Sequence, residues 1–176
     1  MQALVFLIDA VVSFFCALFL LRFLMQAMRV SFAGQIGDFV VKLTNWGVKP
    51  LRRVIPGVGG FDWASVVAAW LLQLALAGVL LSLSPLPLAD EGQLPFLILW
   101  FSVRALLRQL VYILIGALIL QAVLSWINPY SPLAAPAGQL TRPLLQPLQK
   151  LVPSISGIDL SPLVAILLLQ VVLMFL

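Results

Sequence analysis

The chain carries one segment twice. A stretch bounded by prolines, PLRRVIP, occupies residues 50–56, and a second stretch, PLQKLVP, occupies residues 147–153. The same offset of 97 residues aligns Asp62 with Asp159, and a glycine stands two residues before each aspartate. Chance does not align prolines, glycines and aspartates at one spacing, and the period is too long for a solenoid. We therefore predict two copies of one structural unit, fused in tandem.

Composition indicates that both copies lie in a membrane. Hydrophobic residues make up 63% of the chain, charged residues make up 9%, and the mean hydropathy is +1.16. Soluble domains typically contain about 25% charged residues. The single cysteine, Cys16, excludes an intrachain disulfide, and the lack of histidine argues against the usual zinc sites. We expect an integral membrane protein without metal or cofactor, in which Cys16 supplies small packing volume.

Four segments are apolar enough to cross a bilayer core of roughly 30 Å, which takes about 20 helical residues. They are residues 3–28, 63–83, 94–127 and 160–176. The third segment is too long for one crossing, and Arg104 and Arg108 interrupt it. We therefore predict that residues 107–127 span the membrane while residues 94–103 lie obliquely at one surface.

The predicted fold is an all-α membrane protein with four transmembrane helices, arranged as two repeats of two helices with the same orientation. Residues 1–83 form the first repeat, residues 84–93 an outer loop, and residues 94–176 the second repeat. Because each repeat crosses the membrane twice, the two copies are related by an axis along the membrane normal.

Lysine and arginine near the spans predict the orientation. The loops after the first and third spans carry the basic residues Arg29, Lys42, Lys49, Arg52, Arg53, Arg142 and Lys150. The loop between the second and third spans carries Asp90 and Glu91 but no basic residue. We expect both repeat loops to face the cytoplasm and the termini to lie outside. Arg104 and Arg108 count against this orientation, although their long side chains can extend to the outer surface. No basic leader or cleavage site precedes the first span, so we expect it to be retained.

The repeat loops contain amphipathic segments. Between residues 35 and 49, apolar residues recur at helical spacing and polar residues fill the other positions. Such a helix is expected to lie among the headgroups, with its cations toward anionic lipid. The second loop keeps the apolar stripe, but Pro143 and Pro147 predict that it does not form a continuous helix.

Asp62 and Asp159 each stand just before an apolar span. An aspartate at that position typically caps the helix and favours its positive end, and we prefer this interpretation. The alternative is an ion or proton site at the pseudo-twofold axis. Ser161 and Pro162 are predicted as the N-cap and first residue of the last helix.

Arg22 lies inside the first span, where an unpaired charge is costly. It either extends its side chain to the cytoplasmic surface or pairs with Asp62 or Asp159. The glutamines near or within the spans, at positions 26, 73, 121 and 170, suit hydrogen bonds between helices better than a permeation path.

The residues quoted above resemble the YggT family, also called YlmG. The resemblance rests on the prolines and arginines of residues 50–56, on a Gly-x-Asp sequence before each second helix, and on Ser125-Trp126 closing the third span. It covers essentially the whole chain, which departs from the family pattern where Gln149 and Lys150 replace a basic pair. The resemblance implies a small protein of the bacterial inner membrane, linked to cell division, osmotic tolerance or, in plastids, assembly of a haem-bearing cytochrome complex. It implies no catalytic residues.

We therefore expect a non-enzymatic membrane scaffold or assembly factor. Its partners would be anionic lipids, membrane or cytoplasmic proteins and a second copy of itself. The excess of basic residues is explained by their placement in the cytoplasmic loops, so we expect no nucleic acid partner. The alternative is a small channel or transporter module formed by oligomerisation. The chain lacks a phosphate loop, a nucleophile with its base, and a metal-ligand cluster. The residues expected to matter for structure or interaction are Arg22, Pro50, Arg52, Arg53, Pro56, Asp62, Pro147, Lys150, Pro153 and Asp159.

Overall fold

The computed structural model describes residues 2–32, 34–57, 59–83, 91–128, 130–151 and 159–176, which contain helices and no strand. The helices are α1 (Gln2–Ala27), α2 (Gln35–Val54), α3 (Trp63–Ser82), α4 (Leu94–Ile127), α5 (Ala134–Leu151) and α6 (Ser161–Phe175), with a short 3₁₀ turn, η1 (Glu91–Gln93), before α4. The all-helical prediction is therefore confirmed.

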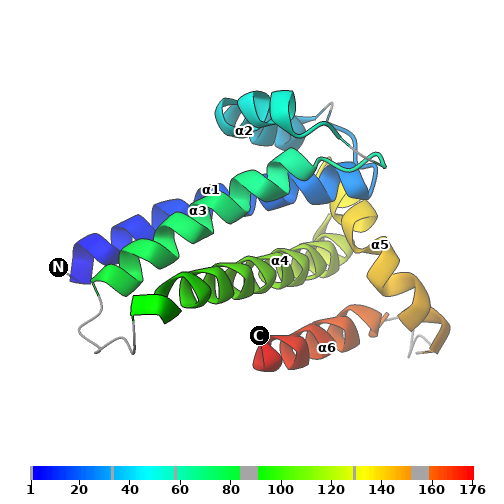
Figure 1. Cartoon of the computed structure of the whole chain (residues 1–176). Coiled ribbons are helices and arrows are strands. Elements are labelled where there is room, and N and C mark those ends of the chain that lie inside the picture. The colour runs from blue at the N-terminus through cyan, green and yellow to red at the C-terminus, as the bar shows by residue number, and fades with distance from the viewer. Residues whose placement is uncertain (1, 33, 58, 84–90, 129, 152–158) are drawn as a thin grey trace.

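The long helices lie side by side. In Figure 1, α1, α3 and α4 run along the length of the molecule, α3 packs against both α1 and α4, and α6 packs against α4. The shorter helices α2 and α5 lie toward the end of the molecule where α1 and α4 finish, the N-terminus lies at the opposite end, and the C-terminus lies between the two ends, where the short α6 finishes. In each half of the chain, the amphipathic helix contacts the long helix before it and the apolar helix after it.

Three of the described helices are long and apolar enough to cross a membrane: α1, α3 and α4. The fourth apolar helix, α6, has 15 residues, which at about 1.5 Å per residue is shorter than a bilayer core. Large apolar side chains are exposed along all four, among them Phe6 and Leu7 of α1 and Leu167 and Phe175 of α6. Exposed apolar surface of this extent is compatible with a membrane protein.

Helix α4 is one continuous helix of 34 residues, so the predicted change of direction between residues 94–103 and 107–127 is wrong. Pro95 lies in the first turn, where a backbone N–H would have no helical partner in any case. Arg104 and Arg108 are good helix formers, and the Arg108 guanidinium lies 3.4 Å from the Tyr112 hydroxyl one turn later. Charge therefore interrupts the apolar pattern here without interrupting the helix.

The proline-rich loops are more helical than the sequence predicts. Helix α2 continues through Pro50 to Val54, and α5 runs through both Pro143 and Pro147. The prediction of a broken second segment is wrong because both prolines lie on the exposed side of α5. A carbonyl that loses its N–H partner there can be solvated, so the helix persists despite the missing bonds.

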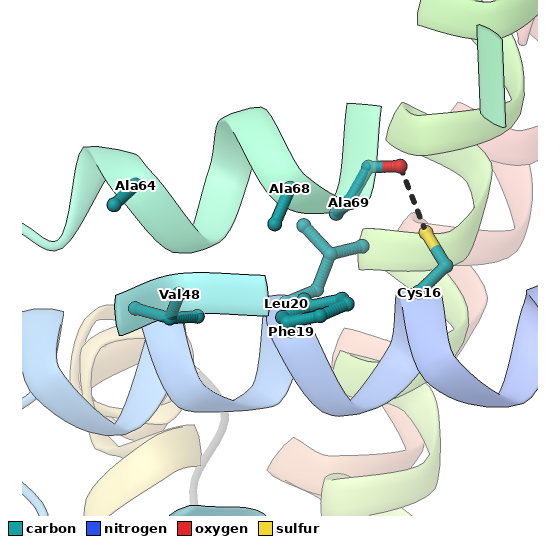
Figure 2. Close-up of a cluster of buried hydrophobic side chains, with 7 residues drawn as sticks. All are labelled: Cys16, Phe19, Leu20, Val48, Ala64, Ala68 and Ala69. Carbon is teal, nitrogen blue, oxygen red and sulfur yellow. Dashed lines mark hydrogen bonds between the residues drawn. The ribbon is translucent and has the colours of Figure 1, made fainter. Parts of the chain in front are cut away.

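The core between α1 and α3 is built on small residues. Ala64, Ala68 and Ala69 of α3 are buried against Phe19 and Leu20 of α1, as Figure 2 shows. In the same cluster Cys16 is fully buried and its Sγ lies 3.8 Å from the Ala69 carbonyl oxygen. Cys16 therefore occupies the position of a small packing residue, as expected, and the alanines allow the two helices to approach closely.

Two glycines allow α2 to pack closely. A Cβ at Gly37 would lie 2.4 Å from the Phe32 carbonyl oxygen, and one at Gly47 would lie 2.8 Å from the Phe19 ring. The Phe19 ring can shift, whereas the Phe32 backbone cannot move without displacing the turn before α2. In α5, a Cβ at Gly138 would have no neighbour within 4 Å.

We predict that Gly37→Ala lowers the free energy of unfolding by about 1–3 kcal/mol, the usual cost of overpacking. The matched control Gly138→Ala should be neutral or stabilise by up to about 1 kcal/mol, because alanine is the better helix former. Thermal unfolding followed by tryptophan fluorescence in detergent would measure both. Equal stability of the two variants would contradict the close approach at Gly37.

Candidate functional site

Asp62 forms the centre of a buried ionic network. It precedes α3, and its side chain is 2% exposed. Arg52, from the last turn of α2, donates from Nε to Oδ1 at 3.2 Å and from Nη2 to Oδ2 at 2.6 Å. The Ser65 hydroxyl donates to Oδ2 at 2.8 Å. Asp62 is the N-cap residue of α3, as the preferred interpretation predicts, but its carboxylate makes no capping bond to the helix backbone and binds the side chains of Arg52 and Ser65 instead.

Arg22 reaches the same carboxylate from α1. Its Nε lies 3.4 Å from Oδ2 of Asp62, and its side chain is 7% exposed. Its Nη1 donates to Thr44 Oγ1 at 2.7 Å and to Asn45 Oδ1 at 3.1 Å. Of the two alternatives drawn from the sequence, the structure shows the pairing with Asp62. The Thr44 hydroxyl in turn donates to the Val40 carbonyl oxygen at 2.6 Å, so the guanidinium is held on several sides.

Gln26 closes the network toward the surface. Its Nε2 donates to the Gly60 carbonyl oxygen at 3.1 Å, and its Oε1 accepts from Arg52 Nη2 at 3.4 Å. This glutamine therefore serves hydrogen bonding between segments, as the sequence predicts for such amides. Together the contacts join the end of α1, the length of α2 and the start of α3.

The chemistry of Asp62 follows from these contacts. Burial raises the pKa of the carboxyl, but the hydrogen bonds from Arg52 and Ser65 and the charges of both arginines more than offset it, so the pKa lies below its ordinary value. Both carboxylate oxygens already accept from donors, which leaves Asp62 poorly suited to act as a base or to hold an ion. Its role in this geometry is to fasten three helices together.

The second repeat has the same layout without the arginines. Gln149 stands ten residues before Asp159, as Arg52 stands ten residues before Asp62, and its Nε2 donates to Asp159 Oδ2 at 2.8 Å. The Thr141 hydroxyl donates to the Ala137 carbonyl oxygen at 2.9 Å, as Thr44 does to Val40.

Gln121 of α4 takes the place of Arg22. The Thr141 hydroxyl contacts Oε1 of Gln121, a residue 20 positions earlier, whereas Arg22 precedes Thr44 by 22 positions. The offset of 97 residues between the two repeats therefore holds from α2 and α5 onward. The residues of α4 match those of α1 at an offset two residues larger. Neutral amides thus replace both cations of the first repeat.

Asp159 behaves as the sequence predicts for a cap. Its Oδ1 accepts from the Ser161 backbone N–H at 2.9 Å. The N-cap itself is Leu160, so the helix begins one residue earlier than predicted, with Ser161 as its first residue and Pro162 as its second. Burial raises the pKa of Asp159, but hydrogen bonding from Ser161 and Gln149 outweighs it, and the pKa lies below its ordinary value.

The remaining predicted residues do not join the network. Arg53 and Lys150 are exposed and form no ion pair within the described ranges. Pro50 and Pro147 lie inside helices, and Pro56 is exposed between α2 and α3. Pro153 lies outside the described residues.

Sequence reasoning missed Asp9. It lies within α1, seven residues after the helix begins, and it is exposed on the apolar surface. With Gln73 of α3 and apolar residues of α3 and α4, it lines a cavity of about 330 Å³. Arg22, which the sequence analysis singled out, is therefore not the only charged residue within α1. An aspartate within an apolar stretch was the available signal.

We predict that Asp62→Asn destabilises the protein by roughly 3–5 kcal/mol, because it leaves the buried guanidinium of Arg22 without its counterion and also removes the ion pair with the half-exposed Arg52. The matched change in the second repeat, Asp159→Asn, should cost about 1 kcal/mol, since only a cap is lost. Denaturant unfolding in lipid nanodiscs would measure both. A similar loss for the two variants would contradict the central role of Asp62.

Comparisons with known proteins identify the family of this chain. The family model CCB3/YggT matches residues 1–83 and 100–176. An uncharacterized protein of Pseudomonas aeruginosa is 36% identical over 172 residues, covering 97% of this chain and 86% of the relative. The uncharacterized protein YggT of Escherichia coli K12 is 35% identical over 174 residues, covering 98% and 88%. A Vibrio alginolyticus protein is 34% identical over 173 residues, covering 97% and 91%. No solved structure matches. From the family model and these near full-length relatives, we conclude that this chain belongs to the CCB3/YggT family.

Proposed function

We propose that this protein is a non-enzymatic scaffold or assembly factor of the bacterial cytoplasmic membrane, which presents α2 and α5 to lipid and protein partners. The observation that carries the proposal is the way α2 is fastened. The network around Asp62 fixes one face of α2 against the helix bundle, and the opposite face is left exposed and basic. A helix held in this way can serve as a rigid docking surface.

The exposed face of α2 suits an anionic surface. Lys42, Lys49 and Arg53 recur at helical spacing on the side opposite the buried Val40, Thr44 and Val48, and all three are exposed. Each cation near an anionic membrane surface contributes about 1 kcal/mol.

Trp46 lies in the same stripe and is 59% exposed, with its ring 5.8 Å from the rings of Phe15 and Phe19. Tryptophan at the edge of an apolar surface is typical of the membrane interface. Asp38 adds one negative charge at the start of the helix, where it is favourable.

In this proposal all four apolar helices span the membrane, and α2 and α5 lie on its cytoplasmic side. Both follow a long helix that ends at the same end of the molecule, and both bear basic residues in their last turns. The 15 residues of α6 reach about 23 Å, which local thinning of the bilayer can accommodate.

The non-enzymatic part of the proposal is supported by the state of the polar groups. The Ser65 hydroxyl donates to Asp62, whose carboxylate is already held by arginine, so neither group is placed to activate the other. Within the described ranges, no group of three or more His, Cys, Asp or Glu residues could hold a metal ion.

One observation favours the alternative of a channel or transporter module. Asp9 and Gln73 place a carboxylate and an amide beside a cavity between apolar helices, and charged residues within spans often mark ion pathways. The cavity lining is otherwise apolar, and the amide of Gln170 lies on the exposed side of α6. These features favour the scaffold over the pore.

We predict that a cysteine at Lys150 is protected from an impermeant thiol reagent added to intact cells, and that a cysteine at Gln93 is labelled. Both would be tested in a Cys16→Ala background. The reason is that basic loops stay in the cytoplasm and the loop before α4 lies outside. The opposite labelling pattern would overturn the proposed orientation.

We predict that Lys49→Gln with Arg53→Gln lowers partner capture about tenfold or more, because two surface cations are lost. Capture would be measured in cells by crosslinking from a photoreactive phenylalanine at Phe39, which is 51% exposed on α2. The control Arg104→Gln with Arg108→Gln removes the same charge from α4 and should leave capture unchanged. Arg52 is unsuitable for this test because it holds Asp62.

Two results would contradict the scaffold. The first is that Phe39 captures neither lipid nor protein. The second is solute flux through liposomes carrying the purified protein, abolished by Asp9→Asn and unaffected by the Lys49 and Arg53 changes. That second result would establish the pore.

A further inference from the structure

The carboxylate of Asp159 holds the place of Asp62 but has neither of its cations. Asp62 accepts hydrogen bonds from Arg52 and Ser65 and pairs with Arg22. At the corresponding positions of the second repeat stand Gln149 and Gln121, and Gln121 contacts Thr141 instead of the aspartate. The fold of the repeat is therefore built around a carboxylate that binds guanidinium groups, and in its second copy that position has no cation from the described chain.

Asp159 keeps capacity for more hydrogen bonds. A carboxylate offers about four acceptor positions, and the described contacts use one on each oxygen: the Ser161 N–H on Oδ1 and the Gln149 amide on Oδ2. Arg142 and Lys150 are exposed on α5, and neither forms an ion pair with Asp159. Oε1 of Gln149, whose amide nitrogen is already engaged, has no described donor.

The Ser161 hydroxyl is an independent sign of an unfilled site. Ser161 is fully buried, and its Oγ is the buried side-chain polar atom of the described residues that has no hydrogen-bond partner. The hydroxyl lies close enough to the Asp159 carboxylate to help lower the pKa of that carboxyl. A buried hydroxyl without a partner costs about 1–3 kcal/mol, so such an atom is rarely left in place without a use.

We propose that Asp159, Gln149 and Ser161 form a binding site for a guanidinium group, filled by an arginine side chain of a partner protein. The carboxylate supplies the charge, and Gln149 Oε1 and the Ser161 hydroxyl supply neutral acceptors beside it. This is the combination that surrounds the arginines at Asp62, where Thr44 and Asn45 are the neutral acceptors. The planar guanidinium, with five N–H donors, fits several acceptors better than a compact ammonium does. The assignment of the arginine to a partner protein rests on the proposed scaffold function. The guanidinium site itself does not depend on that function.

The site can be tested on the full chain in phosphatidylcholine nanodiscs. The probes are ethylguanidinium and, as the matched control, propylammonium. Carbon-13 NMR of the aspartate carboxyl groups reports binding, and the Asp159 signal is assigned by its loss in Asp159→Asn. We expect ethylguanidinium to shift this signal at millimolar concentration and propylammonium to shift it at least severalfold less.

Gln149→Arg is the decisive variant because it restores the pair found in the first repeat. Its own guanidinium should occupy Asp159, shift the carboxyl signal without any probe, and abolish the response to ethylguanidinium. The variant should also unfold about 2 °C higher than the unchanged protein. Equal responses of the unchanged protein and Gln149→Arg, or equal responses to the two probes, would overturn the proposal.

Two further measurements decide the source of the arginine. In cells, capture from a photoreactive residue at Gln146, exposed one turn before Lys150, should fall in Gln149→Arg. Unchanged capture, or an Asp159 shift produced by phosphatidylethanolamine nanodiscs alone, would overturn the assignment to a partner protein. Capture from Phe39 tests the scaffold function separately, since α2 belongs to the first repeat and does not include this site.

Discussion

The burial of one carboxylate constrains how α1, α2 and α3 meet in the first repeat. Asp62 is almost fully enclosed, and a charged group in such a place is tolerated only when partners replace its lost hydration. Arg52 supplies two hydrogen bonds from α2, and Arg22 supplies a further charge from α1. Because these partners come from different helices, the carboxylate also determines how the helices meet. The close packing of Gly37 and Gly47 against their neighbours depends on α2 lying where this network holds it.

The duplication gave each repeat the same frame and different chemistry. Thr44 and Thr141 bond equivalent carbonyl groups, and each aspartate is contacted by the residue ten positions before it. In the first repeat that residue is an arginine, and the result is a closed ionic network. In the second it is Gln149, and the aspartate is left partly satisfied and closer to solvent. One repeat is thus suited to fastening helices, and the other to contact with a separate molecule.

Local rules predicted the helices and failed where side chains on different helices meet. The apolar spans were recognisable from their length, and the amphipathic character of α2 from its spacing. Pro143 and Pro147 led to the wrong prediction of a broken helix. The free-energy cost of a proline inside a helix depends on whether the carbonyl that loses its N–H partner is exposed to solvent, and the sequence does not show this. For an aspartate just before a helix, the sequence favoured capping over an ion or proton site. The Asp159 carboxylate does accept a hydrogen bond from a backbone N–H of α6, whereas Asp62 occupies the N-cap position of α3 but its carboxylate is bound by Arg52 of α2 instead.

The sequence by itself predicted an all-helical protein with long apolar segments and an internal repeat, because hydropathy, helical spacing and a fixed offset are properties of the chain. It also narrowed Arg22 to two alternatives, since a charge inside an apolar span needs either water or a partner. Only the tertiary structure decided that Arg22 pairs with Asp62, that Arg52 pairs with the same carboxylate while the adjacent Arg53 forms no ion pair among the described residues, and that the Ser161 side chain is buried. The physical reason is that each depends on how the helices approach and rotate, and a change of one residue along a helix turns a side chain by about 100°.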